Sequence, residues 1–152
     1  MILVYDYIIH AYGVYSKKND EGAFAFVVCD GEDSIAFNRA YKIQHETNNR
    51  AQLKAIIAAL YQLPKFYAKN IMVVSSSQYA LNTLFNGWSR NTNNDLFDVY
   101  EKIQKERQFN IEWCWVKGHS DDDFFNELCD RLCKDVLGYD ANEEFTKFKK
   151  KK

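Results

Sequence analysis

The sequence predicts an α/β domain of the α+β type, a mixed five-stranded sheet with helices on both faces. Three strand-like segments come first and are joined by short connections, which favours an antiparallel meander. Helical apolar spacing then alternates with two further strand-like segments, which favours parallel strand–helix units. The expected element order is therefore βββαβααβα.

The first three strands are predicted from apolar runs separated by polar turn residues. The first run is apolar on both faces except at Asp6, which is typical of a central strand. Lys, Asn, Asp, Glu and Gly fill the connection that follows it, which indicates a loop. The expected strands are Ile2–Ile9, Ala23–Cys29 and Ser34–Ile43, with a loop over Tyr15–Gly22 and a turn over Asp30–Asp33.

The rest of the chain is predicted from a change to helical periodicity. Leu53, Ile56, Ile57 and Leu60 follow the i, i+3, i+4, i+7 pattern of an amphipathic helix, which Thr47 can cap. The later expected elements are a strand over Asn70–Val74, a short helix over Gln78–Phe85, a helix over Asp95–Arg107, a strand over Ile111–Val116 and a helix striped by Phe125, Leu128, Cys129, Leu132, Cys133 and Val136.

Composition describes one well-packed domain. The 152 residues are 47% hydrophobic and 16% aromatic with a single proline, which excludes disordered and low-complexity classes. We expect a domain over 1–138 and a charged tail over 139–152. The longest apolar run, Met1–Tyr5, is far too short to span a membrane, and we recognise no signal peptide. The four cysteines are interpreted as reduced core residues, so we expect an intracellular protein of the cytoplasm or nucleus that is not secreted.

Two acids stand out as candidate metal ligands. Asp6 interrupts an apolar strand, and Asp130 lies next to the apolar stripe of the last helix. A carboxylate in apolar surroundings is costly unless it is paired, protonated or metal-bound. Mg²⁺ prefers oxygen ligands and commonly uses one or two carboxylates. The alternative remains open that Asp6 sits at an exposed strand end and that Asp130 is a solvated helical acid.

Four segments together resemble type 1 ribonuclease H. They are Thr47-Asn48-Asn49-Arg50, Ser77-Gln78-Tyr79, Trp115-Val116-Lys117-Gly118-His119 and the Asn126-Glu127-x-Cys129-Asp130 segment. Their order and spacing agree with that family's domain from about residue 2 to 138. The resemblance implies a ribonuclease H-like fold and a protein that acts on RNA/DNA hybrids.

The resemblance also implies that the metal centre of this chain is incomplete. In the family, four carboxylates hold two Mg²⁺ ions that align a water and the scissile phosphate. The first-strand and last-helix acids correspond to Asp6 and Asp130, whereas the other two positions carry Gln52 and Ser76. We expect weak Mg²⁺ binding, of as few as one ion, with Mn²⁺ as an alternative ion. Asp6 is followed by Tyr7 and Ile8 where the family has Gly-Ser.

The residues that would read nucleic acid are better retained. The resemblance assigns hybrid contacts to Asn48, Asn49 and Gln78, and a role in turnover to the mobile-loop residue His119. Contacts to the 2′-hydroxyl distinguish RNA from DNA. The structural alternative for Asn48 is helix capping, as it is for Thr47 and Ser77.

Three functions remain open at this point. The first is a hybrid-binding domain with little or no hydrolysis, a pseudoenzyme. The second is an active hybrid endoribonuclease that cleaves the RNA strand. The third is a structural connection-type domain of a larger polymerase, reverse transcriptase or polyprotein assembly. The net charge of −1 excludes a strongly basic binder, so phosphate affinity would come from local groups such as Lys147–Lys152. We expect the isolated domain to be a monomer.

Overall fold

The structure is a computed structural model that describes residues 4–30, 34–64, 68–86, 92–117 and 124–138. The predicted order βββαβααβα is confirmed. The predicted tail over 139–152 lies outside the described residues. The elements are β1 (Tyr7–Ser16), β2 (Glu21–Cys29), β3 (Ile35–Ile43), α1 (Asn48–Gln62), β4 (Asn70–Ser75), α2 (Gln78–Leu84), α3 (Asn94–Arg107), β5 (Asn110–Trp115) and α4 (Phe124–Leu137).

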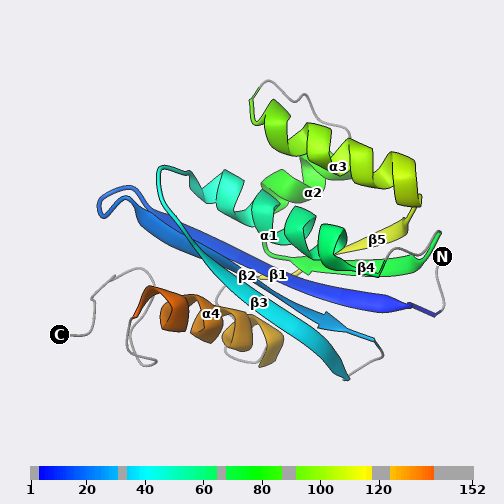
Figure 1. Cartoon of the computed structure of the whole chain (residues 1–152), viewed down its shortest axis with the longest axis horizontal. Coiled ribbons are helices and arrows are strands. Elements are labelled where there is room, and N and C mark those ends of the chain that lie inside the picture. The colour runs from blue at the N-terminus through cyan, green and yellow to red at the C-terminus, as the bar shows by residue number, and fades with distance from the viewer. Residues whose placement is uncertain (1–3, 31–33, 65–67, 87–91, 118–123, 139–152) are drawn as a thin grey trace.

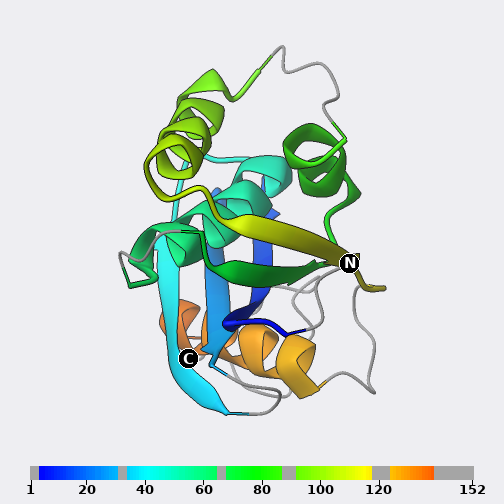
Figure 2. The same cartoon turned by 90° about the vertical axis from the view of Figure 1, so that its right-hand side faces the viewer.

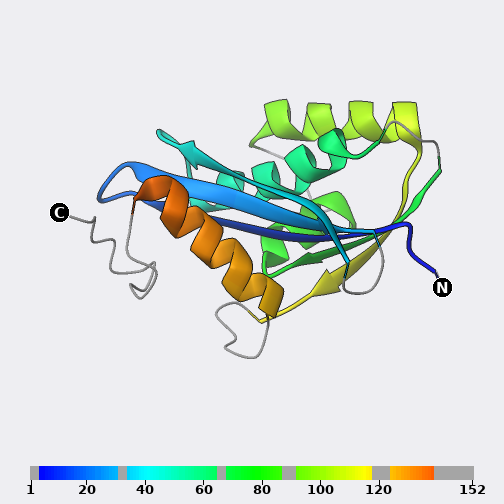
Figure 3. The same cartoon turned by 60° about the horizontal axis from the view of Figure 1, so that its bottom comes forward.

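One mixed sheet organises the domain. Its strand order is β3-β2-β1-β4-β5, with β1 antiparallel to β2 and parallel to β4. The α1 helix packs on one face, with α2 and α3 on the same side, and α4 packs on the other face (Figures 1, 2 and 3). The predicted fold class, a mixed five-stranded sheet with helices on both faces, is confirmed. No described helix is both long enough and apolar enough to cross a membrane.

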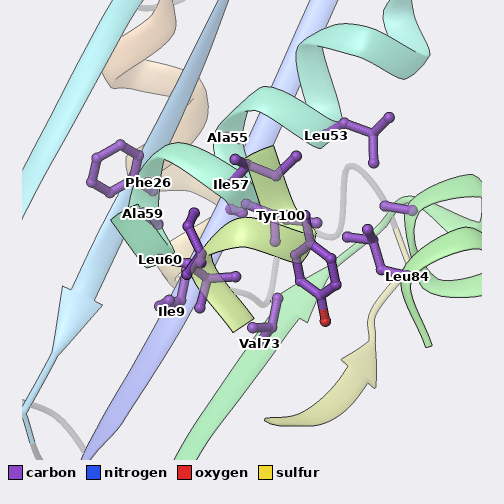
Figure 4. Close-up of a cluster of buried hydrophobic side chains, with 14 of the residues drawn as sticks. Ile9, Phe26, Leu53, Ala55, Ile57, Ala59, Leu60, Val73, Leu84 and Tyr100 are labelled. Atoms are coloured by element: carbon purple, nitrogen blue, oxygen red, sulfur yellow. The ribbon is translucent and has the colours of Figure 1, made fainter. Parts of the chain in front are cut away.

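The two faces of the sheet carry two separate cores, because successive side chains of a strand point to opposite faces. Ile9 and Phe26 face α1, where they join Leu53, Leu60 and Val73 in the larger core (Figure 4). On the α4 face, a smaller cluster contains Tyr12, Ala25, Val27, Cys29, Cys129 and Cys133. The interpretation of Cys29, Cys129 and Cys133 as core residues is confirmed, and all four cysteines are thiols.

The first strand lies further along the chain than the sequence predicts. It covers Tyr7–Ser16, and a short turn at 17–20 leads into β2, so most of the expected Ile2–Ile9 strand lies before or at its start. The reason is pairing with β2, which extends from Ile8 opposite Cys29 to Ser16 opposite Glu21. These cross-strand hydrogen bonds bring polar residues near the turn into the ladder.

The helix starts agree closely with prediction, but the inner face of α4 does not. Thr47 and Ser77 cap α1 and α2 by accepting hydrogen bonds from Arg50 N and Ala80 N. On α4, Val136 is exposed although we expect it in the apolar stripe, whereas Lys134 is buried. The helix is therefore rotated so that Asp130 and Lys134 belong to the face that meets the sheet.

Candidate functional site

The parallel register of β1 and β4 defines where polar side chains meet. Tyr7 lies opposite Ile71 and His10 opposite Val74. Continuing this register places Ser76, just after β4, level with Tyr12. The two strands therefore bring Tyr12 and Ser76 to the same end of the sheet, whereas Asp6 lies at the other end, beside Asn70.

Asp6 is held at the start of β1 by local contacts. Its backbone N–H donates to the Asn70 carbonyl oxygen at 2.8 Å, and its Oδ2 accepts from the Asn70 backbone N–H at 2.8 Å. Lys69 Nζ lies 3.9 Å from Oδ1, and both side chains are well exposed. Tyr12 lies six positions after Asp6, which is about 20 Å along an extended strand. The structure does not bring Asp6 and Asp130 together, so the predicted pairing of these two acids is corrected here.

Tyr12 is the β1 residue that faces Asp130. Its ring is buried between the sheet and α4, and its hydroxyl donates to Asp130 Oδ1 at 3.1 Å. Burial, followed by the negative charge of Asp130, raises the pKa of Tyr12 well above its usual value. Tyr12 therefore stays a neutral O–H donor at physiological pH. A neutral phenol offers a metal much less than a carboxylate does.

Gly13 brings β1 against α1 at this same level. A Cβ at Gly13 would lie 2.5 Å from the Ala51 carbonyl carbon and 2.7 Å from Gln52 N. Only glycine permits this backbone approach. The sequence resemblance includes an acid followed by glycine, and Tyr12-Gly13 provides the glycine that Asp6-Tyr7 lacks. Gly13 is thus the signal that could have identified Tyr12 from the sequence.

Asp130 is engaged on both carboxylate oxygens. Besides accepting from Tyr12, it forms an ion pair with Lys134, whose Nζ lies 2.9 Å from Oδ2. The Lys134 side chain is 8% exposed and that of Asp130 is 24% exposed. We call these three residues the Tyr12–Asp130–Lys134 cluster. Sequence analysis singled out Asp130 and missed its two partners.

The other two expected metal positions carry uncharged side chains. Gln52 lies on the turn of α1 that crosses β1 at Gly13. Ser76 follows β4, and its carbonyl oxygen accepts a hydrogen bond from Trp115 Nε1 at 3.1 Å. Within the described part of the chain, no three His, Cys, Asp or Glu residues are grouped closely enough to hold a metal ion.

A small hollow lies beside the cluster and is bordered by Tyr12. The His10 ring stacks on Phe125 with centroids 3.9 Å apart and planes 11° from parallel. A hollow of about 10 Å³ remains between these rings, Val74 and Val116. This volume corresponds to about one water molecule.

The predicted nucleic-acid residues lie at the starts of two neighbouring helices. Asn48 and Asn49 open α1 and Gln78 opens α2, and all three are exposed. Asn48 Oδ1 accepts from the Tyr15 backbone N–H at 2.9 Å, which fixes this end of α1 to β1. The predicted site residue His119 and the acidic loop Asp121–Asp123 lie outside the described residues.

A polar network joins the two helix starts into one surface. Arg50 makes a two-pronged contact with Asp95, with both N–O distances 2.8 Å. Arg50 Nη1 also donates to Asn93 Oδ1, and Asn93 Nδ2 donates to the Tyr79 hydroxyl at 3.0 Å. The hydrogen bonds from Arg50 hold the pKa of Asp95 at about 2, below its usual range. We call the exposed amides of Asn48, Asn49 and Gln78 on this support the amide surface.

Comparison with known proteins covers nearly the whole described chain. Residues 5–137 match the family described as RNase H. A ribonuclease H of Treponema pallidum is 34% identical over an alignment of 117 residues, and the match covers 68% of each chain. A ribonuclease H of Thermoanaerobacter is 35% identical over 62% of this chain and 66% of its own length. A ribonuclease H of Syntrophus aciditrophicus is 29% identical over 86% of this chain and 80% of its own.

Proposed function

Because the chain belongs to the ribonuclease H family, we propose that it binds RNA/DNA hybrids and hydrolyses them little or not at all. The proposal combines a retained amide surface with an incomplete metal centre. It treats residues 1–138 as the hybrid-binding domain of an intracellular protein.

The single observation that carries the loss of hydrolysis is the hydrogen bond from Tyr12 to Asp130. The family generally uses divalent metal ions, and Mg²⁺ sites are built from anionic oxygens. Tyr12, Gln52 and Ser76 supply no carboxylate, and the carboxylate of Asp130 already accepts from Tyr12 and pairs with Lys134. The residues present do not fit Mg²⁺ or Mn²⁺, so we propose weaker metal binding than the sequence suggested.

Hybrid binding is supported by the chemistry and the rigidity of the amide surface. Side-chain amides both donate and accept hydrogen bonds, as the 2′-hydroxyl of RNA also does. Asn48 is tied to β1, and the contacts of Arg50, Asn93 and Tyr79 fix α1 against α2. Groups held in this way lose less conformational entropy when a ligand binds.

Fluorescence anisotropy with an 18-base-pair RNA/DNA hybrid and a DNA duplex of the same sequence tests the binding. We expect tighter binding to the hybrid in EDTA, and affinity for both that falls steeply with salt. Asn49→Ala with Gln78→Ala should reduce the preference for the hybrid at least tenfold. The control is Asn110→Ala, an exposed amide at the opposite end of the sheet. Equal affinity for both duplexes would contradict the proposal and favour the structural connection-type function.

A cleavage assay separates the proposal from an active endoribonuclease, which the names of the relatives favour. Labelled hybrid is incubated with Mg²⁺ or Mn²⁺ and resolved on a denaturing gel. We expect no cleavage by the natural chain. Cleavage that Asp130→Asn abolishes would establish the endoribonuclease instead, with His119 and Asp121–Asp123 as the next residues to test.

A gain-of-function variant sharpens the same test. Gln52→Glu with Ser76→Asp leaves Tyr12 in place, so we expect it to remain inactive. Adding Tyr12→Asp supplies an acid at the fourth position, and adding Lys134→Met removes the cation that pairs with Asp130. We expect cleavage in Mg²⁺ only from the variant that carries all four changes. Cleavage by the double variant would show that Tyr12 is not the obstacle.

The charged tail has a separate proposed role. Lys147–Lys152 would add affinity for phosphates without distinguishing RNA from DNA. Its removal should weaken hybrid and DNA binding alike. If the isolated domain shows no preference for the hybrid, the result favours a structural domain of a larger assembly.

A further inference from the structure

Lys134 is an unusual buried cation. It is one of four buried residues of α4, together with Cys129, Cys133 and Leu137, and its side chain is 8% exposed. Lysine is rarely buried without a partner, because its ammonium loses hydration. Its ion pair is with Asp130, four residues earlier on the same helix, at 2.9 Å. Both charges of this ion pair therefore belong to α4, the helix that packs on the sheet.

The pair occupies the position at which the family resemblance places a metal ligand. Asp130 contributes one negative charge, which the Lys134 ammonium neutralises. Tyr12 supplies a hydrogen bond to the other carboxylate oxygen at 3.1 Å and adds no charge. A divalent ion bound at Asp130 would displace Lys134 and leave an unpaired ammonium in an apolar interface, which is strongly unfavourable.

We infer that the Lys134 ammonium is the permanent counter-ion of Asp130 and takes the place that a divalent metal has in the family. The fold of this chain therefore needs no metal to neutralise its last-helix acid. This inference deepens the proposed function, because a hybrid-binding domain with its own cation would bind equally well in EDTA and in Mg²⁺.

The natural protein tests the inference with Mn²⁺ alone as the probe. The electron paramagnetic resonance signal of free Mn²⁺ is followed as protein is added, for the natural chain and for Asp130→Asn. We expect both proteins to leave the same free Mn²⁺ concentration up to the millimolar range. Sub-millimolar binding by the natural chain that Asp130→Asn removes would overturn the inference.

A pair of double variants asks whether Lys134 is what excludes the metal. Tyr12→Asp creates a second carboxylate, and it is combined with Lys134→Met or with Lys105→Met, which removes an exposed lysine of α3. We expect Lys134→Met to tighten Mn²⁺ binding at least tenfold over Tyr12→Asp alone, and Lys105→Met to leave it unchanged. Equal Mn²⁺ affinity in all three proteins would overturn the inference. Lys134→Gln replaces Lys134→Met if the latter fails to fold by circular dichroism.

The outcomes also separate the inference from the proposed function. Cleavage of hybrid by a natural chain whose Mn²⁺ signal does not respond to Asp130→Asn would contradict the proposed function and leave the inference standing. Mn²⁺ binding at Asp130 without cleavage would overturn the inference and leave the proposed function standing.

Discussion

Two aspartates with lysine partners lie at opposite ends of this sheet. They differ in exposure, in the distance to the lysine and in the group from which they accept a hydrogen bond. Asp6 is 40% exposed, Lys69 is 36% exposed, and their charged atoms are 3.9 Å apart. Asp130 is 24% exposed, Lys134 is 8% exposed, and their charged atoms are 2.9 Å apart. Asp6 also accepts from the backbone of Asn70, whereas Asp130 accepts from the buried phenol of Tyr12.

The difference teaches that burial, not placement in an apolar run, gives a carboxylate its energetic importance. Water screens the exposed pair, so it contributes little to stability. At the other pair, neither charge can be removed without leaving its partner in poorly solvated surroundings. The sequence treats the two acids as equivalent candidates, and the fold makes them unequal.

The largest expected effect comes from breaking the buried pair. Asp130→Asn leaves Lys134 without its counter-charge, so we expect the free energy of unfolding to fall by about 3 kcal/mol. Asp6→Asn, which is the matched change at the exposed pair, should cost less than about 1 kcal/mol. Urea denaturation followed by circular dichroism measures both. Equal losses would break the comparison.

A comparable effect is expected where β1 crosses α1. Gly13→Ala places a methyl group against the Ala51 backbone, which should destabilise the protein by about 2–3 kcal/mol. The control is Gly138→Ala, where an added Cβ would meet nothing within 4 Å and the φ is 77°, so it should cost only about 1 kcal/mol. Thermal or urea unfolding gives the ranking. A neutral Gly13→Ala would contradict the close approach of β1 to α1.

A smaller effect isolates the phenol of Tyr12. Tyr12→Phe removes a hydrogen bond to a charged acceptor and should cost about 1–2 kcal/mol near pH 7. Because the folded pKa of Tyr12 is raised, its stabilising contribution is complete below the unfolded value near 10 and is lost as pH rises above it. The stability difference between the natural chain and Tyr12→Phe should therefore shrink above pH 10. A Tyr61→Phe control, at an exposed ring, should show no such change.

The smallest expected effect concerns a third ion pair, Arg50 with Asp95, which supports the amide surface. The pKa of Asp95 is lowered to about 2, so its contribution is complete above the unfolded value near 4 and is lost as pH falls towards 2. The Asp95 side chain is 63% exposed, so we expect Asp95→Asn to cost less than about 1 kcal/mol at pH 7. Unfolding curves from pH 5 to 2 should converge for the two proteins. A constant gap would indicate that Asp95 acts through something other than its charge.

Local chemistry explains what the sequence predicted well. The starts of α1 and α2 depend on Thr47 and Ser77, whose hydroxyls satisfy backbone N–H groups within three residues. Helical periodicity identified α1 and the existence of α4, because those patterns arise within one element. The order of strands and helices followed from the same signals. Element order and caps are therefore properties that neighbouring residues determine.

The site depended on contacts that no local pattern contains. Residues from Met1 to Tyr15 are mostly apolar, so nothing within the segment fixes where the strand begins, and Asp6 was the visible acid. Because it pairs with β2 and β4, β1 extends to Ser16, beyond the predicted end at Ile9, and Tyr12 lies level with Ser76. Strand register is a relation between segments distant in sequence, and a shift along the strand changes which side chains meet.

The sequence by itself determined the element order, the helix caps and the family of the fold, because these depend on short-range hydrogen bonding and on motifs with fixed spacing. Only the tertiary structure decided that Tyr12 donates to Asp130 and that Lys134 is buried against it. The physical reason is that burial and charge pairing depend on how α4 and β1 pack together. An i, i+4 pair of charges is ordinary on a solvated helix and decisive when packing removes the water around it.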